Sequence, residues 1–133
     1  MATFKRFEDI EAWQRAREIT RRIYALSNDG PFLRDHGLRD QVRRAAVSVM
    51  ANIAEGFGRG GNREFSQFLG HARGSLAELK SHLYVALDAG FIGEQVLNEL
   101  LALCSQTEAQ ISGLINYLST SEKRGPRLRA ASP

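Results

Sequence analysis

The feature that most constrains the fold is a run of apolar residues whose spacings alternate between four and three. The run consists of Phe65, Leu69, Ala72, Leu76, Leu79, Leu83 and Ala86. Because an α-helix turns once every 3.6 residues, this spacing places all of these side chains along one side of a helix. Asn62 precedes the run as a candidate N-cap, and Gly90 follows it as a candidate left-handed residue after the helix C-terminus. The run therefore predicts a long amphipathic helix between these two residues.

Three other segments repeat this spacing. The repeated residues are Ala12, Ala16, Ile19, Ile23 and Leu26 in the first segment, Leu38, Val42, Ala45, Val49 and Ile53 in the second, and Leu97, Leu100, Cys104, Thr107, Ile111, Leu114 and Leu118 in the last. They predict one helix that starts at an Asp9 N-cap, one from about Leu38 to Phe57, and one from about Glu94 to Ser119. The chain is expected to hold four long helices.

Turn-forming residues separate the predicted helices. The segment 27–31 reads Ser-Asn-Asp-Gly-Pro, and glycines follow the second helix at positions 58, 60 and 61. Gly and Pro both disfavour continuation of a helix. No apolar alternation of period two is sustained, so strands are not expected. The prediction is an all-α fold, and short turns between long helices favour an antiparallel up-down-up-down four-helix bundle.

The last predicted helix has a wider apolar stripe than the other three. Val96, Leu101, Leu103 and Ile115 flank the seven residues of its repeat. A stripe of this width indicates a second buried contact, for which another subunit is one candidate.

Length and composition indicate one small domain. The chain has 133 residues, of which 43% are hydrophobic and 25% are charged. We expect residues 1–120 to form the bundle and residues 121–133, which hold four bases and two prolines, to form a basic, disordered tail.

Cys104 is the single cysteine, and no apolar stretch approaches the roughly 20 residues that span a bilayer. These features predict a cytoplasmic protein with no membrane contact.

Charge is distributed unevenly along the chain. Residues 1–80 carry an excess of basic residues, whereas residues 81–120 carry four acidic residues and no base. Such segregation is typical either of a basic surface that binds nucleic acid or of complementary surfaces that meet within a fold or between subunits. Base-stacking platforms need exposed aromatic residues interleaved with basic ones, and the sequence shows no obvious interleaving. Trp13 is expected to fold over one end of the bundle or over another subunit, and Tyr24 to be half-buried.

No motif in the sequence predicts catalysis. The segment from Gly56 to Gly61 satisfies the letters G-x-G-x-x-G, but a helix rather than a strand leads into it, so it is not a dinucleotide-binding loop. We interpret it as a helix-to-helix turn. No Glu-x-x-His pair is present for a bundle metal site, and no nucleophile elbow exposes a serine. We therefore expect a protein that is not an enzyme and holds no cofactor or metal.

Polar residues along the second and third predicted helices have spacings that place them on one side of each. The set comprises Ser48, Asn52, Glu55, Ser75 and Glu78. We expect these five residues to form a hydrogen-bonded structural network between the two helices.

Three stretches of the chain resemble a known family. They are residues 7–16, residues 37–56, which contain Ser-x-x-x-Asn-Ile-Ala-Glu-Gly, and residues 64–79, which contain Gly-Ser-x-x-Glu-Leu. Together they are similar to the bacterial four-helix-bundle proteins named for intervening sequences in 23S rRNA genes, over about residues 4–118. The resemblance implies an antiparallel bundle that is the protomer of a ring-like homo-oligomer, a homopentamer. It also implies a relation to the accessory protein of diversity-generating retroelements, which binds nucleic acid and a reverse transcriptase through basic surface.

Two readings of function follow. The first is a non-enzymatic oligomeric module that contacts RNA, DNA or a nucleoprotein partner. Its first candidate phosphate contacts are Arg43, Arg44, Arg59 and Arg63, and its second are Arg15, Arg17, Arg21 and Arg22. The alternative is a structural or protein-interaction scaffold that binds no nucleic acid, which the equal numbers of bases and acids in residues 1–120 favour.

Overall fold

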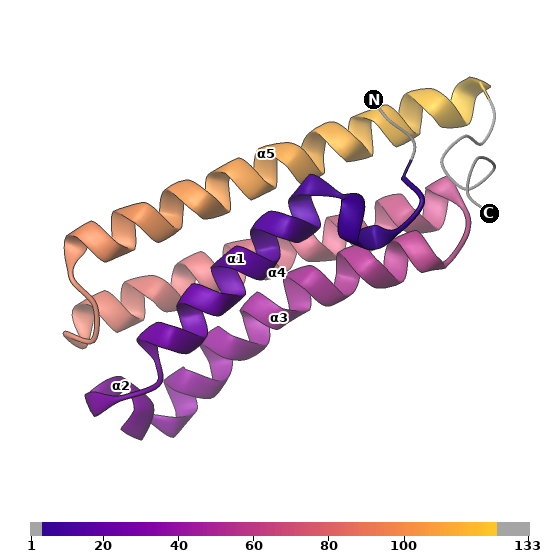
Figure 1. The fold of residues 1–133 in the computed structure, drawn as a ribbon. Helices are drawn as coiled ribbons and strands as arrows, with labels where there is room; N and C mark the ends of the chain where they lie inside the picture. The colour runs from indigo at the N-terminus through magenta and orange to yellow at the C-terminus, as the bar shows by residue number, and fades with distance from the viewer. Residues whose placement is uncertain (1–3, 125–133) are drawn as a thin grey trace.

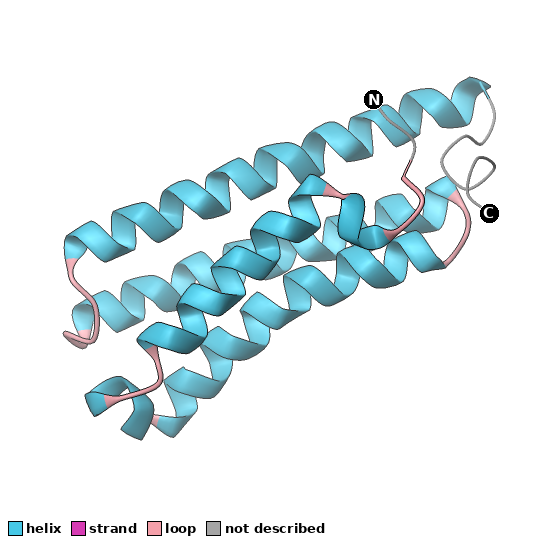
Figure 2. Ribbon diagram, viewed as in Figure 1, coloured by secondary structure: helices cyan, strands magenta, loops and turns pink. Residues whose placement is uncertain are grey.

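The computed structural model describes residues 4–124 of the chain, with side chains described as far as residue 120. Its elements in chain order are the 3₁₀ helix η1 (Phe7–Asp9) and the helices α1 (Glu11–Leu26), α2 (Gly30–Arg34), α3 (His36–Gly58), α4 (Asn62–Asp88) and α5 (Glu94–Arg124). Figure 2 shows helices joined by short connections, and residues 4–124 contain no strand. The predicted all-α class is confirmed.

The four long helices lie side by side (Figure 1). Helix α3 packs against α4, α4 packs against α5, and α1 packs against both α3 and α5. Figure 1 shows the α3–α4 turn at one end of the molecule, and α2 and the α4–α5 connection at the other. At that second end, the ring of Phe32 in α2 stacks on the ring of Phe91 at a centroid distance of 5.2 Å. The short helix thus helps to close one end of the core.

Most of the core consists of the residues that the helical repeats predicted. All seven repeat residues of α4 and all seven of α5 are buried, as are Ala12, Ala16, Ile19 and Ile23 of α1. Cys104 is among them, and burial raises the pKa of its thiol to about 11. This thiol therefore remains protonated, and unreactive, across the physiological range.

The wide apolar stripe of α5 packs within its own chain. Val96, Leu101, Leu103 and Ile115 are half-buried against the core. The large apolar side chains that are exposed among the described residues lie on other helices. They are Tyr24 of α1, Val47 of α3, and Tyr84 and Val85 of α4.

Two predicted helix starts are wrong. Asp9 belongs to η1, and the N-cap of α1 is Ile10, which makes no capping hydrogen bond through its side chain. Asn62 is the first residue of α4 rather than its cap, which is Gly61. Asn62 is buried, with 6% of its surface exposed. In both places the N-cap lies one residue away from the residue with the better capping side chain.

Further boundaries differ from the prediction. The sequence predicts only the end of a helix at Gly30-Pro31. In the structure these two residues begin α2, because Pro is compatible with the first turn of a helix. Helix α3 begins at His36, where the carboxylate of Asp35 accepts a hydrogen bond from the backbone N–H of Leu38 at 3.0 Å. Helix α5 continues to Arg124, beyond the expected end at Ser119. The remainder of the predicted basic tail, residues 125–133, lies outside the described residues.

The predicted C-terminal glycine of α4 is confirmed. Gly90 has a φ of +80°. The N–H of Phe91 donates to the carbonyl of Ala86 at 2.9 Å, and the N–H of Gly90 donates to the carbonyl of Leu87 at 3.0 Å. This pair of bonds is a Schellman motif, in which the left-handed residue reverses the chain toward α5.

Gly56 allows α3 and α4 to approach closely beside their turn. A Cβ atom at this position would lie 2.6 Å from the Cβ of Phe68 and 3.2 Å from Cδ1 of Phe65. The Cβ of Phe68 moves only with its backbone, so neither helix can yield easily. Two residues further on, a Cβ atom at Gly58 would meet nothing within 4 Å.

We predict that Gly56→Ala destabilises the protein whereas Gly58→Ala does not. Overpacking at position 56 is expected to lower the free energy of unfolding by about 1 to 3 kcal/mol. Gly58→Ala is the matched control, because it adds the same methyl group in open space and restricts the unfolded chain. Urea denaturation followed by circular dichroism measures both, and equal stabilities would contradict a close approach at Gly56.

Within the described residues, none of the helices combines the length and the apolar character that crossing a membrane requires.

Candidate nucleic-acid interface

The four arginines expected to form the first phosphate contacts do not lie together. Arg43 and Arg44 belong to the first half of α3, whereas Arg59 and Arg63 flank the α3–α4 turn. Sixteen residues of continuous chain separate Arg43 from Arg59, which corresponds to about 24 Å along a helix. The expected set therefore divides into two pairs at different ends of the molecule.

Arg43 fixes the end of α1. Its Nε donates to the hydroxyl of Ser27 at 2.8 Å, and its Nη2 donates to the carbonyl of Ser27 at 3.1 Å. Ser27 is fully buried, and its hydroxyl donates to the carbonyl of Ile23 at 2.7 Å. Arg43 thus satisfies a carbonyl that the C-terminus of α1 leaves unpaired. Most of its hydrogen-bonding capacity points inward, which makes it a poor phosphate contact.

The charge of Arg59 is offset by its own helix. Its guanidinium lies 2.8 Å from the Glu55 carboxylate and 5.1 Å from the centre of the Phe68 ring. The hydrogen bond with Glu55 raises the pKa of Arg59 further. Arg63 and Arg44 are exposed and make no ion pair with a described residue.

Part of the segregated charge meets within the chain. Arg22 of α1 lies 2.8 Å from Glu99 of α5, and Lys80 of α4 lies 3.1 Å from Glu108 of α5. The hydrogen bond from Arg22, followed by one from Gln95, lowers the pKa of Glu99. Complementary charge between helices thus accounts for two of the four acids in residues 81–120.

Arginines contact aromatic rings on α1, and one of these arginines belongs to α3. We call this surface the α1–α3 face, and it consists of Trp13, Arg17, Arg21, Tyr24, Arg43 and Val47. The Arg17 guanidinium lies 5.9 Å from the centre of the Trp13 ring, and the Arg43 guanidinium lies 4.4 Å from the centre of the Tyr24 ring. Tyr24 is 43% exposed and Val47 is 41% exposed. Arg17 and Arg21 are exposed, and neither has a carboxylate partner among the described residues.

The sequence shows no obvious interleaving of aromatic and basic residues, but the structure places arginines against the rings of Trp13 and Tyr24. Arg43 reaches Tyr24 from another helix, 19 positions away in the chain. The spacing in the sequence indicates only the contacts within α1, because Trp13 and Arg17 are four residues apart and Arg21 and Tyr24 are three apart. Trp13 contacts Phe7 edge-on, with ring centres 5.1 Å apart, and is half-buried under this aromatic cover.

The structure joins three of the five residues of the expected polar network. The hydroxyls of Ser48 and Ser75 are 2.8 Å apart across α3 and α4, and Nδ2 of Asn52 donates to the carbonyl and the hydroxyl of Ser48 at 2.8 and 3.0 Å. Glu55 and Glu78 do not take part. Each is exposed and contacts a residue one turn ahead on its own helix, Glu55 with Arg59 and Glu78 with His82. The expectation was wrong for these two because a long carboxylate at the edge of the seam reaches solvent and a nearby cation.

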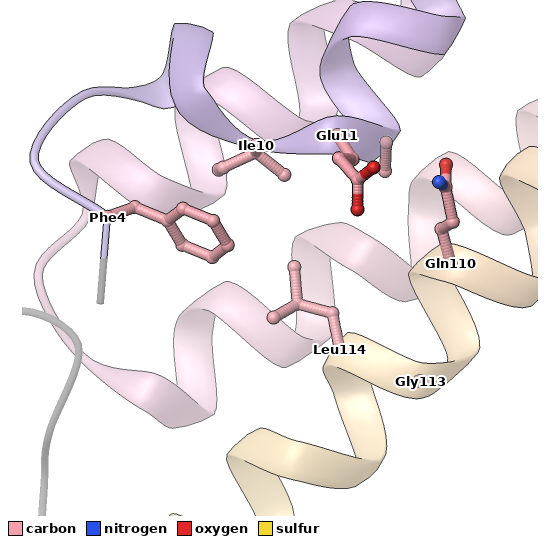
Figure 3. A pocket seen from close by; sticks show the side chains of 7 residues that line it. Phe4, Ile10, Glu11, Gln110, Gly113 and Leu114 are labelled. Atoms are coloured by element: carbon pink, nitrogen blue, oxygen red, sulfur yellow. The ribbon is translucent and has the colours of Figure 1, made fainter. Parts of the chain in front are cut away.

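One cavity of about 430 Å³ opens between the start of α1 and α5 (Figure 3). Phe4, Ile10 and Leu114 form its apolar wall, and Glu11 and Gln110 are its polar residues. The amide oxygen of Gln110 is shielded and accepts no hydrogen bond from a described residue. The lining holds no nucleophilic side chain. Among the described residues, no three His, Cys, Asp or Glu side chains are placed to hold a metal ion.

We predict that Arg43 contributes to stability and that Arg44 does not. Arg43→Ala removes the donors to buried Ser27 and is expected to lower the free energy of unfolding by about 1 to 3 kcal/mol. Arg44→Ala changes a solvated surface residue and should stay within about 0.5 kcal/mol of the wild type. Chemical denaturation compares the two neighbours directly, and a loss of equal size in both variants would refute the role of Arg43 as a clamp on α1.

Comparison with known proteins agrees with the motifs and the helical architecture. No curated protein matches the chain. The family model described as 23S rRNA-intervening sequence protein matches residues 8–113. This match spans most of the 133 residues, from η1 through two thirds of α5. The chain belongs to the 23S rRNA-intervening sequence protein family.

Proposed function

We propose that this protein is a non-enzymatic, oligomeric module that contacts nucleic acid, or a nucleoprotein partner, through the α1–α3 face. The observation that carries the proposal is that Arg17 and Arg21 are exposed and unpaired beside exposed Tyr24. Arg22, Arg39 and Arg59, in contrast, each lie 2.8 or 2.9 Å from a carboxylate oxygen. An arginine without a carboxylate partner is available to phosphate.

The helical position of these arginines adds to the argument. Arg17 and Arg21 lie four residues apart, so their side chains are neighbours on the surface of α1. Like charges at this spacing repel one another and weaken a helix slightly. A polyanion would convert this repulsion into two favourable contacts with release of counterions. The proposed contacts therefore move from Arg43 and Arg59 to Arg17 and Arg21, and exposed Arg44 on α3 is a further candidate.

The proposal includes the arrangement and assembly of the chain. The four long helices form an up-down-up-down antiparallel bundle, and this bundle is the protomer of a cytoplasmic, ring-like homopentamer. Similarity to the family supports the assembly, and exposed Tyr84 and Val85 supply apolar surface on α4 for contacts between subunits. A ring is closed by two different surfaces of each subunit, so a basic face can remain free.

The same apolar residues favour the second candidate, a scaffold that binds another protein and no nucleic acid. Tyr84 and Val85 of α4 are each about half exposed, whereas Arg17 and Arg21 lie on α1. Purified scaffold protein would be free of nucleic acid and would give no response to an RNA or DNA probe.

The nucleic-acid proposal predicts binding that depends on salt and on the α1–α3 face. Fluorescence anisotropy with a 30-nucleotide single-stranded RNA, titrated between 50 and 200 mM NaCl, should show a steep loss of affinity for the full chain. Arg17→Gln/Arg21→Gln should weaken binding and reduce the slope of log K against log salt by about 1.4.

Arg59→Gln/Arg63→Gln is the matched control with the same change in charge, and it should lose less affinity because Glu55 already offsets Arg59. Equal losses in the two double variants would assign the contact to another surface. Absence of binding to RNA and DNA at 50 mM salt would leave the scaffold as the function.

The assembly is predicted to have a mass of five chains. Light scattering coupled to size-exclusion chromatography, over a tenfold range of protein concentration, measures this mass. A single-chain particle throughout the range would overturn the oligomer, whatever the outcome of the binding experiment.

A further inference from the structure

Tyr24 is an aromatic side chain that is exposed yet held in place. It lies in the last turn of α1 and is 43% exposed. The guanidinium of Arg43 lies over its ring, 4.4 Å from the centre. A cation–π contact of this kind covers one face of the ring and fixes its orientation, while the side chain stays partly exposed.

Arg43 is itself immobilised by the chain of contacts already described. It donates to Ser27 at 2.8 and 3.1 Å, and buried Ser27 donates to the carbonyl of Ile23. Arg43, which is held by its hydrogen bonds to Ser27 at the end of α1, therefore fixes the position of the Tyr24 ring. A preorganised aromatic surface loses little conformational entropy when it binds a flat partner.

Two bases precede Tyr24 on its side of α1. Arg21 precedes it by three residues and Arg17 by seven, which places both on the same side of α1. Asp40 is the acid closest to Arg43 in the sequence, and it pairs with Arg39 at 2.9 Å. The hydrogen bond from Arg39 lowers the pKa of Asp40 most, and the charge of Arg43 lowers it less. The surface thus presents an aromatic ring with bases along one side, a combination that suits a base and its flanking phosphates.

From this geometry we infer that Tyr24 is a stacking platform for an unpaired base, so that the α1–α3 face selects single-stranded over double-stranded nucleic acid. The inference rests on the proposed function and specifies its ligand. A ring that projects from the side of a helix packs face to face with a base only when that base is free of its own stack. In a duplex the base faces are covered, and this surface contacts phosphates alone.

Variants of Tyr24 test the inference in the full-length protein. The probes are a 30-nucleotide single-stranded RNA, the DNA of the same sequence, and the 30-base-pair duplex. Tyr24→Leu should lower affinity for the single strands about tenfold, with the salt slope unchanged, because stacking is lost and no phosphate contact is removed. Its affinity for the duplex should not change, and Tyr24→Phe should bind all probes as the wild type does.

A second variant reports on stacking directly. Tyr24→Trp in a Trp13→Phe background leaves one tryptophan in the chain, since Trp13 is the only one. Its fluorescence should be quenched by either single strand and not by the duplex at equal occupancy. Circular dichroism melts of each variant show whether a loss of binding accompanies a loss of fold. Because quenching is measured on the tryptophan variant, it tests stacking even if Tyr24→Leu is unstable.

The outcomes separate this inference from the proposed function. Wild-type affinity of Tyr24→Leu for the single strands, absence of quenching, or equal affinity for duplex and single strand would overturn the stacking platform. In those cases, loss of binding in Arg17→Gln/Arg21→Gln would still support a phosphate-binding face. Failure of the wild type to bind any probe would overturn both.

Discussion

The fold depends on one constraint, which is that an amphipathic helix can remove its apolar stripe from water only by packing it against another stripe. Four apolar stripes pack against one another here. The repeat residues of α4 and α5 are all buried, and helix α1 adds Ala12, Ala16, Ile19 and Ile23. Each of these residues contributes to stability through the surface that it removes from water. Because the stripes face inward, the remaining sides of the helices are free to carry charge and aromatic rings.

The distribution of that charge follows from which helices become neighbours. Arg22 and Lys80 meet acids of α5 because α5 packs against both α1 and α4. Arg17 and Arg21 are exposed and have no carboxylate partner among the described residues. Arg43, on the side of α3 that meets α1, closes the end of α1 and supports Tyr24. Packing thus sorts similar arginines into ion pairs, a structural clamp and an available basic face.

Several predictions from the sequence were wrong where a local preference competed with a neighbouring helix or with solvent. Glu55 and Glu78 had the spacing of network members, but a carboxylate at the edge of the α3–α4 seam is more stable beside a cation in water than in a buried cluster. Ser48, Asn52 and Ser75 are short enough to pair inside that seam. Asp9 and Asn62 had favourable capping chemistry, but the entry of the chain into each helix is set by η1 and by the tight turn at Gly60, whose φ is +104°.

The sequence by itself determined the four long helices, most residues of the core and the family. These depend on spacings of three and four residues and on short motifs, and a helix expresses such patterns within its own few turns. Only the tertiary structure decided which arginines are available and where an exposed ring is supported. Tyr24 and Arg43 are 19 positions apart, and Arg22 and Glu99 are 77 apart. Contacts at such separations are fixed by the packing of one helix on another, which no local pattern in the sequence encodes.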